Sequence, residues 1–405
     1  MDEVVALPQL NQQYIKANNL KTLFQMIQKN EDISRVELAR KAGLSKATVS
    51  SLIDELITNE FVVDCGISSR PSAGRKPNRL SVNPSGSYTA VFHFHRNWLS
   101  AALVNLKSEV VFELRINRTT GLNYVENAVS LFENELLTRE KNIRILGVCV
   151  IVPAIIDPSS RKIVSTVLVD ALPENAIDQL MKGFGGYPLI ILNDTSCYAY
   201  AECRYNRMES EYFAFVNLGQ GVGAVMIDHG KLFRCANGMT TQFGHFSIAR
   251  NGELCSCGSR GCLERMIGEA WLFDRAGKEG LRNIFANKSE ADFQTLKARA
   301  DQGDAEAVSL IRTLAADAAY AIGNLISLFN PDEVVIGGGG TVLGQLFLDA
   351  LSESIHHAGF PLFVGATGIR FTSLDKSSVI RGAEQYFIDQ YYSFDRKYQE
   401  TFIIG

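Results

Sequence analysis

Hydrophobic positions in the first 80 residues recur at the three- and four-residue spacing of amphipathic helices. Residues 13–29 carry one such stripe, and two shorter stripes follow over 34–42 and 45–59. From Tyr88 onward, short apolar runs alternate with amphipathic stretches, and glycine clusters close several of the runs. Alternation of strands and helices is typical of an α/β domain. The pattern therefore predicts a small helical domain followed by a larger α/β body.

Capping and turn residues give the three helices the arrangement of a helix-turn-helix. Ser34 and Glu37 have the spacing of a capping box, and Gly43 suits a turn that needs a positive φ. Small Ala39 lets two helices cross closely, and Val49 fills the space between them. The front of the third helix then offers short polar side chains to the DNA major groove: Lys46, Ala47, Thr48, Ser50 and Ser51. The alternative is an ordinary three-helix bundle with a polar surface.

A basic loop follows the third helix. The stretch from Cys65 to Leu80 carries four basic residues and no acidic one, and it is rich in Ser, Pro and Gly. Residues 61–63 and 80–82 could pair as the strands of a wing, which would bring Arg75 and Lys76 to the minor groove. The alternative is a solvated linker. A single DNA-binding domain offers few base contacts. We therefore expect a homodimer or homotetramer that binds double-stranded operator DNA at a two-fold symmetric site.

Length and charge limit the class of protein. A chain of 405 residues is expected to form two or three domains, and its net charge of −4 excludes a polycationic protein. The first 80 residues are +2, with 11 basic and 9 acidic side chains, so the remainder is −6. The longest apolar run, residues 145–156, is too short for a membrane span and predicts a buried strand. We see no signal peptide at the N-terminus and expect a cytoplasmic protein with no membrane partner.

Four residues have the chemistry of a closed metal site. His245 is followed, after nine residues, by Cys255, Cys257 and Cys262, which together supply one imidazole and three thiolates. These ligands would fill the tetrahedral shell of Zn²⁺ and leave no position for water, so the ion would be structural. Free cysteines or a single disulfide are the alternative, although neighbouring CxC thiols bridge poorly.

The same residues carry a resemblance. Gly244-His245, the three cysteines with Gly258 and Gly261, and Glu264 together resemble the signature of the ROK family (repressors, open reading frames and sugar kinases). The helix-turn-helix resembles that of its NagC, Mlc and XylR type of regulators. The resemblance implies an α/β fold, with a winged helix-turn-helix before a two-lobed, actin-like (ribonuclease H-like) body that holds a sugar cleft.

The resemblance also implies domain boundaries. We expect a DNA-binding domain over residues 1–66 and a basic wing and linker over 67–86. The first lobe would span 87–195, completed by a C-terminal helix over 378–405. The second lobe, with the zinc site, would span 196–377.

Kinases of this family have a phosphate loop that is altered here. Their Asp-x-Gly-Gly-Thr loop aligns with residues 93–97, where His93 replaces the aspartate and His95 and Arg96 replace the glycines. Backbone amides cannot approach a phosphate past such side chains, and no carboxylate remains to organise Mg²⁺. The second phosphate loop, residues 219–223, keeps its glycines but lacks the family's hydroxyl, and the glycine run at 337–340 is explained equally well by a turn of the scaffold. We therefore expect neither phosphoryl transfer nor a bound nucleotide.

The positions that bind sugar in this family are altered less than the phosphate loop. The resemblance assigns sugar contacts to Asn193, Asp194, Gln242, His245 and Glu264, where Gln242 stands in place of the family's glutamate. Carboxylates and amides can bind adjacent sugar hydroxyls, which both donate and accept hydrogen bonds. Ala154 also departs from the usual glycine, so the ligand is expected to differ or to bind less tightly.

These observations predict a sugar-responsive transcriptional regulator and not an enzyme. It would repress genes of carbohydrate uptake or catabolism and leave DNA when a sugar or sugar phosphate binds. Three alternatives stay open: a ROK sugar kinase with an appended DNA-binding head, a docking platform for a transport-system protein, and a body whose cleft binds no effector.

Overall fold

The structure is a computed structural model that describes residues 12–30, 32–67, 78–96, 98–117, 123–139, 143–157, 159–165, 172–206, 210–235, 241–285, 291–394 and 402–404. By their internal contacts, the residues fall into two compact units. Unit 1 comprises residues 1–151, 171–192 and 383–405, and unit 2 comprises residues 152–170 and 193–382. Within the described ranges, no helix combines the length and apolar character that crossing a membrane requires.

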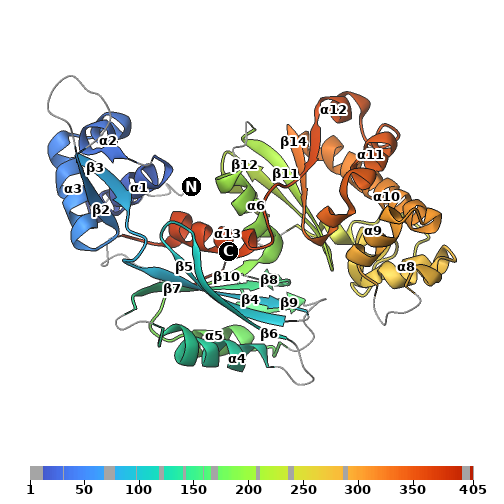
Figure 1. Cartoon of the computed structure of the whole chain (residues 1–405), viewed down its shortest axis with the longest axis horizontal. Helices are drawn as coiled ribbons and strands as arrows, with labels where there is room; N and C mark the ends of the chain where they lie inside the picture. Colours follow the sequence, from blue (N-terminus) through green and yellow to red (C-terminus); the bar gives the residue numbers. More distant parts are fainter. Residues whose placement is uncertain are drawn as a thin grey trace, which may run out of the picture. The chain divides into compact units, whose positions relative to one another are not determined.

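Three helices and a small sheet form the N-terminal head of unit 1 (Figure 1). They are α1 (Gln12–Lys29), α2 (Arg35–Ala42) and α3 (Lys46–Thr58), with strands β1 (Ile33–Ser34), β2 (Val62–Ile67) and β3 (Asn78–Val82) in the order β1-β3-β2. The capping box is present, because Ser34 Oγ accepts from the Glu37 amide while Glu37 accepts from the Ser34 amide. Gly43 has a φ of 66°, and Val49 is fully buried. The predicted helix-turn-helix is therefore confirmed, together with the wing strands, in which Val62 lies opposite Val82.

A six-stranded sheet forms the rest of unit 1, in the order β16-β10-β7-β4-β5-β6. Its strands are β4 (Tyr88–His95), β5 (Trp98–Asn105), β6 (Val110–Asn117), β7 (Ile145–Val152), β10 (Leu189–Asn193) and β16 (Phe402–Ile404). Helices α4 (Tyr124–Leu131) and α5 (Ala176–Gly183) lie together beneath this sheet in Figure 1. The Phe92 ring stacks on that of Phe184 at 5.1 Å, which anchors this layer.

The end of the chain packs against the head within unit 1. Helix α13 (Ser378–Tyr386) runs on into a π-helical turn, η6 (Phe387–Tyr391). Beyond it, the Phe394 ring lies 4.3 Å from that of Phe24 in α1 and 4.9 Å from that of Phe61. Gln25 in α1 also donates to Asp389 in η6 at 2.8 Å. The head is thus held by residues more than 330 positions away in sequence.

Unit 2 is built on a five-stranded sheet in the order β13-β12-β11-β14-β15. Its strands are β11 (Tyr212–Leu218), β12 (Val222–Asp228), β13 (Lys231–Leu232), β14 (Glu333–Gly337) and β15 (Gly368–Phe371). The antiparallel pair β11–β12 has β14 parallel beside it, as the pair β4–β5 in unit 1 has β7. The two sheets therefore share a core of two antiparallel strands with one parallel strand beside them.

Helices cover both faces of the unit 2 sheet. Helix α6 (Asp194–Tyr205) packs on one face, where its Ala199 meets Phe213 and Phe215. The other face carries α7 (Leu263–Ile267), α8 (Leu272–Lys278), α9 (Phe293–Asp301), α10 (Ala305–Phe329), α11 (Gly344–Ile355) and α12 (Pro361–Ala366). Helix α10 begins at Asp304, whose carboxylate caps it, and ends at Asn330 in the left-handed region. Its apolar face forms much of the core of unit 2.

The single strand predicted over residues 145–156 is wrong in extent. Strand β7 ends at Val152, and a separate strand, β8 (Ile155–Asp157), pairs with β9 (Lys162–Ser165) in a small hairpin. Pro153 stands at the break, because proline has no N–H with which to continue a ladder.

Candidate functional site

The front of helix α3 is the candidate DNA-contacting surface. Lys46, Ala47, Thr48 and Ser51 are all exposed there. The hydroxyl of Ser45 accepts from the Thr48 amide at 3.1 Å, which caps the helix and fixes its first turn. These side chains are therefore exposed on a helix that begins at a defined residue, where base edges and phosphates could reach them, and the Thr48 hydroxyl also shares a hydrogen bond of 2.8 Å with that of Ser45. Arg75 and Lys76 lie outside the described residues.

Ser50 differs from its expected place on that exposed front. It is half-buried, and Arg35 at the start of α2 donates to both its carbonyl and its hydroxyl, each at 3.1 Å. The same guanidinium pairs with Asp54 at 2.7 Å. Arg35 thus ties the two helices of the motif together, and Ser50 is held within that link.

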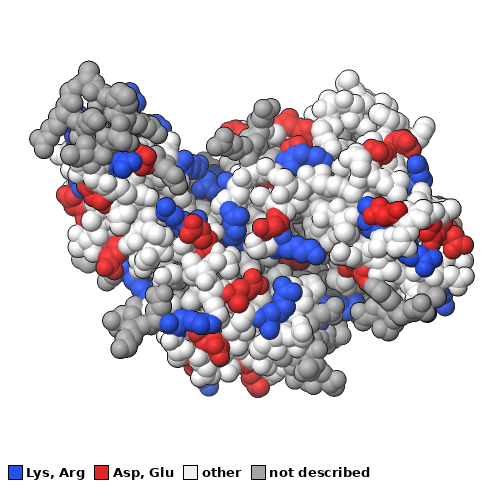
Figure 2. Space-filling view, viewed as in Figure 1, with Lys and Arg blue, Asp and Glu red and all other residues white. Residues whose placement is uncertain are grey.

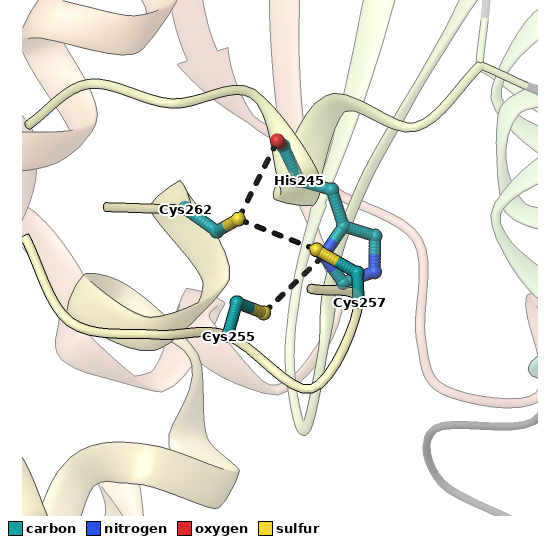
Figure 3. A group of neighbouring side chains, drawn as sticks. All are labelled: His245, Cys255, Cys257 and Cys262. Atoms are coloured by element: carbon teal, nitrogen blue, oxygen red, sulfur yellow. Dashed lines mark hydrogen bonds between the residues drawn. The ribbon is translucent and has the colours of Figure 1, made fainter. Parts of the chain in front are cut away.

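The four predicted metal ligands come together in unit 2 (Figure 3). Their ligand atoms all lie within 4.8 Å of one another. Cys255 Sγ is 3.6 Å from His245 Nδ1, and Cys257 Sγ is 3.6 Å from Cys262 Sγ. A zinc tetrahedron with bonds of about 2.0–2.3 Å has edges of roughly 3.5–3.8 Å. The His/Cys₃ donor set and its spacing therefore fit a four-coordinate ion, with His245 binding through Nδ1.

The backbone of the cysteine loop is shaped for this cluster. Gly258 and Gly261 have φ values of 89° and 66°, in the left-handed region that favours glycine. A Cβ on Gly261 would lie 1.9 Å from the carbonyl oxygen of Ala249, so a larger residue is excluded. Burial, together with the neighbouring thiols, raises the pKa of Cys262 to about 12. A metal ion must therefore displace protons from this cluster when it binds.

Asn193 and Asp194 stand where β10 ends and α6 begins. The Asn193 side chain accepts from the amides of Thr195 and Ser196 as the cap of α6, and it donates to the Ala154 carbonyl at 3.3 Å. One oxygen of Asp194, Oδ1, accepts from the Thr195 amide at 2.7 Å. The structure thus gives Asn193 a capping role as well as its predicted place beside Asp194.

Glu264 brings a second carboxylate close to Asp194. It is buried on α7, its Oε2 accepts from the Val222 amide at 3.1 Å, and its Oε1 has no hydrogen-bond partner among the described residues. Burial raises the pKa of Asp194 to about 6, and the charge of Glu264 adds to the rise. Two carboxylates with spare acceptor capacity can bind the hydroxyl groups of a polar ligand.

Gly244 joins the metal cluster to these carboxylates. A Cβ at this position would lie 2.1 Å from the Val222 carbonyl oxygen and 3.3 Å from Glu264 Oε2, so the chain before His245 runs directly against Glu264. The predicted sugar residues Asp194, His245 and Glu264 are therefore neighbours within unit 2. Gln242 is exposed at the start of the short 3₁₀ turn that holds His245.

The strand end aligned with the kinase phosphate loop, in unit 1, is filled by side chains. His93 is buried, and its ring meets that of Trp98 edge-on at 4.9 Å, while His95 stacks on the same indole at 4.5 Å. Arg115 lies over the indole at 4.0 Å. Burial lowers the pKa of His93 to about 3, with smaller contributions from His95 and Arg115. Aromatic rings and the Arg115 guanidinium thus occupy the position where a phosphate loop would need accessible backbone amides.

Three polar contacts of helix α6 escaped sequence reasoning. Asn217 on β11 donates to Thr195 Oγ1 at 3.2 Å, which ties α6 to the sheet directly behind Asp194. At the other end of α6, fully buried Glu202 binds Arg370 at 2.9 Å and Thr372 at 2.6 Å. Their partners lie 22 to 170 residues away, so spacing along the chain carries no signal for them.

A winged helix-turn-helix combined with an α/β body that holds a metal cluster and paired carboxylates defines a DNA-binding regulator with a separate ligand-binding part. Residues 96–389 match the ROK family, and residues 18–63 match the winged helix-turn-helix DNA-binding family. The chain belongs to the ROK family.

Known repressors resemble the chain over nearly its whole length. The xylose repressor of Caldicellulosiruptor bescii is 28% identical in an alignment that covers 95% of this chain and 98% of the relative. The DNA-binding transcriptional repressor Mlc of Escherichia coli is 21% identical, over 91% of this chain and 92% of the relative.

Solved structures show the same fold. A ROK family transcriptional regulator homologous to E. coli Mlc matches with a TM-score of 0.78 at 22% identity, covering 93% of this chain and 97% of that one. A ROK family glucokinase from Streptomyces griseus, in complex with glucose and AMPPNP, matches with a TM-score of 0.62 at 22% identity, covering 74% of this chain and 98% of that one.

Proposed function

We propose that the protein is a sugar-responsive transcriptional repressor of carbohydrate uptake or catabolism genes. Its head would bind double-stranded operator DNA through Lys46, Ala47, Thr48, Ser50 and Ser51 of the recognition helix, with Arg75 and Lys76 in the wing. The protein would act in the cytoplasm as a homodimer or homotetramer, so that two heads contact a two-fold site. The names of the relatives support both the DNA partner and the kind of effector.

The observation that carries the sugar half of this proposal is the pair of carboxylates beside a metal ligand. Asp194 and Glu264 would accept hydrogen bonds from sugar hydroxyls, with Asn193 and Gln242 completing the site. His245 would bind Zn²⁺ through Nδ1 and present Nε2 to the sugar, since the metal fixes its tautomer. The ion itself would be structural, because four protein ligands complete its shell.

We infer no phosphoryl transfer and no nucleotide cofactor. The packed rings of His93, His95 and Trp98 support this inference, because phosphate binding in this fold would need accessible backbone amides. A coupled ATPase assay across hexoses, pentoses and N-acetylated sugars checks it. Turnover with any of them would favour the sugar-kinase alternative.

Operator release by sugar tests the whole proposal. Fluorescence anisotropy with duplexes from the protein's own promoter region should show binding that one sugar of the panel weakens at least tenfold. The Asp194→Asn variant should bind DNA like the wild type but need much more sugar for release, because the amide replaces an acceptor by a donor. Asp228→Asn, at the exposed far end of β12, is the matched control and should behave like the wild type. Absence of DNA binding, or release unchanged in Asp194→Asn, would contradict the proposal.

A further inference from the structure

Two glycine-rich segments of unit 2, residues 219–223 and 337–340, have no part in the function proposed above. In the sheet they flank Asn217 of β11, which lies opposite Gly223 of β12 on one side and Gly337 of β14 on the other. Residues opposite one another in a sheet point to the same face. Buried Asn217 is therefore the only side chain in its row of three, and the glycines leave space beside it.

Thr195, the second residue of α6, occupies this space. A Cβ on Gly223 would lie 2.6 Å from Thr195 Oγ1, and a Cβ on Gly338 would lie 2.2 Å from Asn217 Oδ1. Both distances are too short for a carbon and an oxygen atom in contact, so a side chain at either glycine would displace its neighbour. Gly219 is different, because a Cβ there would come no closer than 3.8 Å to the atoms around it. Gly223 and Gly338 thus make room for Thr195 and Asn217.

The hydrogen bonds of these two polar residues run in one direction. Asn217 Nδ2 donates to Thr195 Oγ1 at 3.2 Å, so the proton of the Thr195 hydroxyl is directed away from Asn217. Asp194 Oδ1 lies 3.4 Å from that hydroxyl, and it also accepts from the Thr195 amide at 2.7 Å. Both bonds reach Oδ1, so Oδ2 is the oxygen of Asp194 that is left to bind a ligand.

We propose that Thr195 and Asn217 are positioning residues for Asp194, and that Gly223 and Gly338 serve this carboxylate by making room for them. A side chain that is held before its ligand arrives loses less entropy when the ligand binds. The inference rests on the proposed function, because Asp194 is the sugar-binding carboxylate assigned there. It deepens that function by giving these glycines a role that needs no nucleotide.

The second carboxylate of the site is held in a similar way. Glu264 Oε2 accepts from the Val222 amide at 3.1 Å, and Oε1 has no hydrogen-bond partner among the described residues. Each carboxylate thus has one oxygen bound to a backbone amide and one oxygen available. Two available acceptors of negative charge favour a neutral polyol whose neighbouring hydroxyl groups donate to them, and they disfavour a phosphate group at this position.

Local contacts decide the charge of Asp194. Burial raises its pKa most and the charge of Glu264 adds to the rise, whereas both hydrogen bonds from Thr195 lower it. Burial also raises the pKa of Cys197 and that of Tyr198 on the same helix, so both side chains stay neutral where Asp194 titrates. On the face drawn in Figure 2, acidic and basic side chains are interspersed, and exposed charges are screened over about 10 Å. Removal of the Thr195 hydroxyl should therefore be measurable at Asp194 itself.

Titration of Asp194 in the full chain without sugar tests the positioning role directly. In NMR spectra of protein with isotope-labelled aspartate carboxyl groups, the resonance absent from Asp194→Asn identifies Asp194. It should titrate near pH 6 in the wild type and at higher pH in Thr195→Val, which keeps the shape of threonine without its hydroxyl. Thr195→Ser, which keeps the hydroxyl, should titrate like the wild type. A titration unchanged in Thr195→Val would overturn the proposal.

Sugar affinity extends the test to binding. The probes are D-xylose, D-glucose and N-acetyl-D-glucosamine, one each of the pentoses, hexoses and N-acetylated sugars. For a probe that the wild type binds, calorimetry should show affinity about fivefold weaker in Thr195→Val and within about twofold of the wild type in Thr195→Ser. Asn217→Leu should also weaken binding, and the double variant should be no weaker than Thr195→Val alone, because both residues act through one chain of bonds. Additive losses would exclude Asn217 from the positioning role.

The glycines separate this role from a remnant of nucleotide binding. Gly223→Ala should weaken sugar binding as Thr195→Val does, because the new Cβ displaces the Thr195 hydroxyl, whereas the matched control Gly219→Ala should not. Equal affinities in the two alanine variants would overturn the role given to Gly223. Should Gly223→Ala lose its cooperative melting transition, the comparison of Thr195→Val with Thr195→Ser still decides. If the wild type binds none of the probes while Thr195→Val still raises the titration of Asp194, the proposed function fails and the positioning of Asp194 stands.

Discussion

The contact between the end of the chain and the head gives the sharpest test of the fold. Phe394 is buried, and its ring packs on those of Phe24, Phe61 and Tyr392 at 4.3, 4.9 and 5.2 Å. Truncation of a buried phenylalanine to alanine costs about 3–5 kcal/mol, to which pairing of aromatic rings contributes about 0.5–1.5 kcal/mol per pair. We expect Phe394→Ala to lower the unfolding free energy of unit 1 by about 3 kcal/mol or more.

The two tryptophans allow this loss to be assigned to one unit. Trp98 lies on β5 in unit 1, and Trp271 lies in unit 2. In a Trp271→Phe background, urea unfolding followed by fluorescence reports on unit 1 alone, and the midpoint should fall in Phe394→Ala. Phe394→Leu, which keeps most of the apolar volume, should cost less than about 1.5 kcal/mol.

The functional consequence should be confined to DNA. Operator affinity should drop about tenfold or more in Phe394→Ala, because the head loses its fixed support, while sugar affinity in unit 2 stays within twofold of the wild type. The reasoning is refuted if Phe394→Ala leaves the urea midpoint of the Trp98 signal where it was, or if sugar binding falls as much as DNA binding.

Three further predictions concern the candidate site. Sugar affinity, measured by calorimetry between pH 5 and 7.5, should rise through about pH 6, because burial raises the pKa of Asp194 to about 6 and only the ionised carboxylate accepts two hydrogen bonds; a flat profile would exclude that role. The pKa of Asp194 is thus higher in the folded chain than its value near 4 in the unfolded chain. Its contribution to the free energy of unfolding is therefore fully present below pH 4 and is lost as the pH rises through 6. Purified protein should hold one zinc per chain by atomic absorption, and Cys262→Ser should lose it and melt at a lower temperature; full metal content in that variant would show other ligands. Lys46→Ala should weaken binding to all duplexes about equally and reduce by about one the slope of log affinity against log salt concentration, as expected for the loss of one phosphate contact. A loss of affinity for one sequence alone would instead show that Lys46 reads a base.

Local chemistry made much of the fold and the metal cluster predictable. The capping box of Ser34 and Glu37, the left-handed turn at Gly43 and the cysteine spacing all act over fewer than about 20 residues. Such features need only the neighbouring chain to form, so their residue types and spacing determine them.

Long-range contacts were not predictable in the same way. Arg35 holds Ser50 from another helix, and Gln25 meets Asp389 across 364 positions. A glutamine or an arginine on a helix surface has many possible partners, and only the folded chain selects one of them. Asn193 shows a further limit, because its side chain caps helix α6, a role that the sugar contact proposed for it did not suggest.

The position of residues 387–394 has a consequence for how the protein is made. The recognition helix ends at Thr58, yet the Phe394 ring that supports the head is added only after more than 300 further residues have been translated. A nascent chain still on the ribosome, or a product truncated before Phe394, would carry a DNA-reading motif without its anchor. Full operator affinity would therefore be reserved for chains translated at least as far as Phe394, which also contain unit 2 with its proposed effector site.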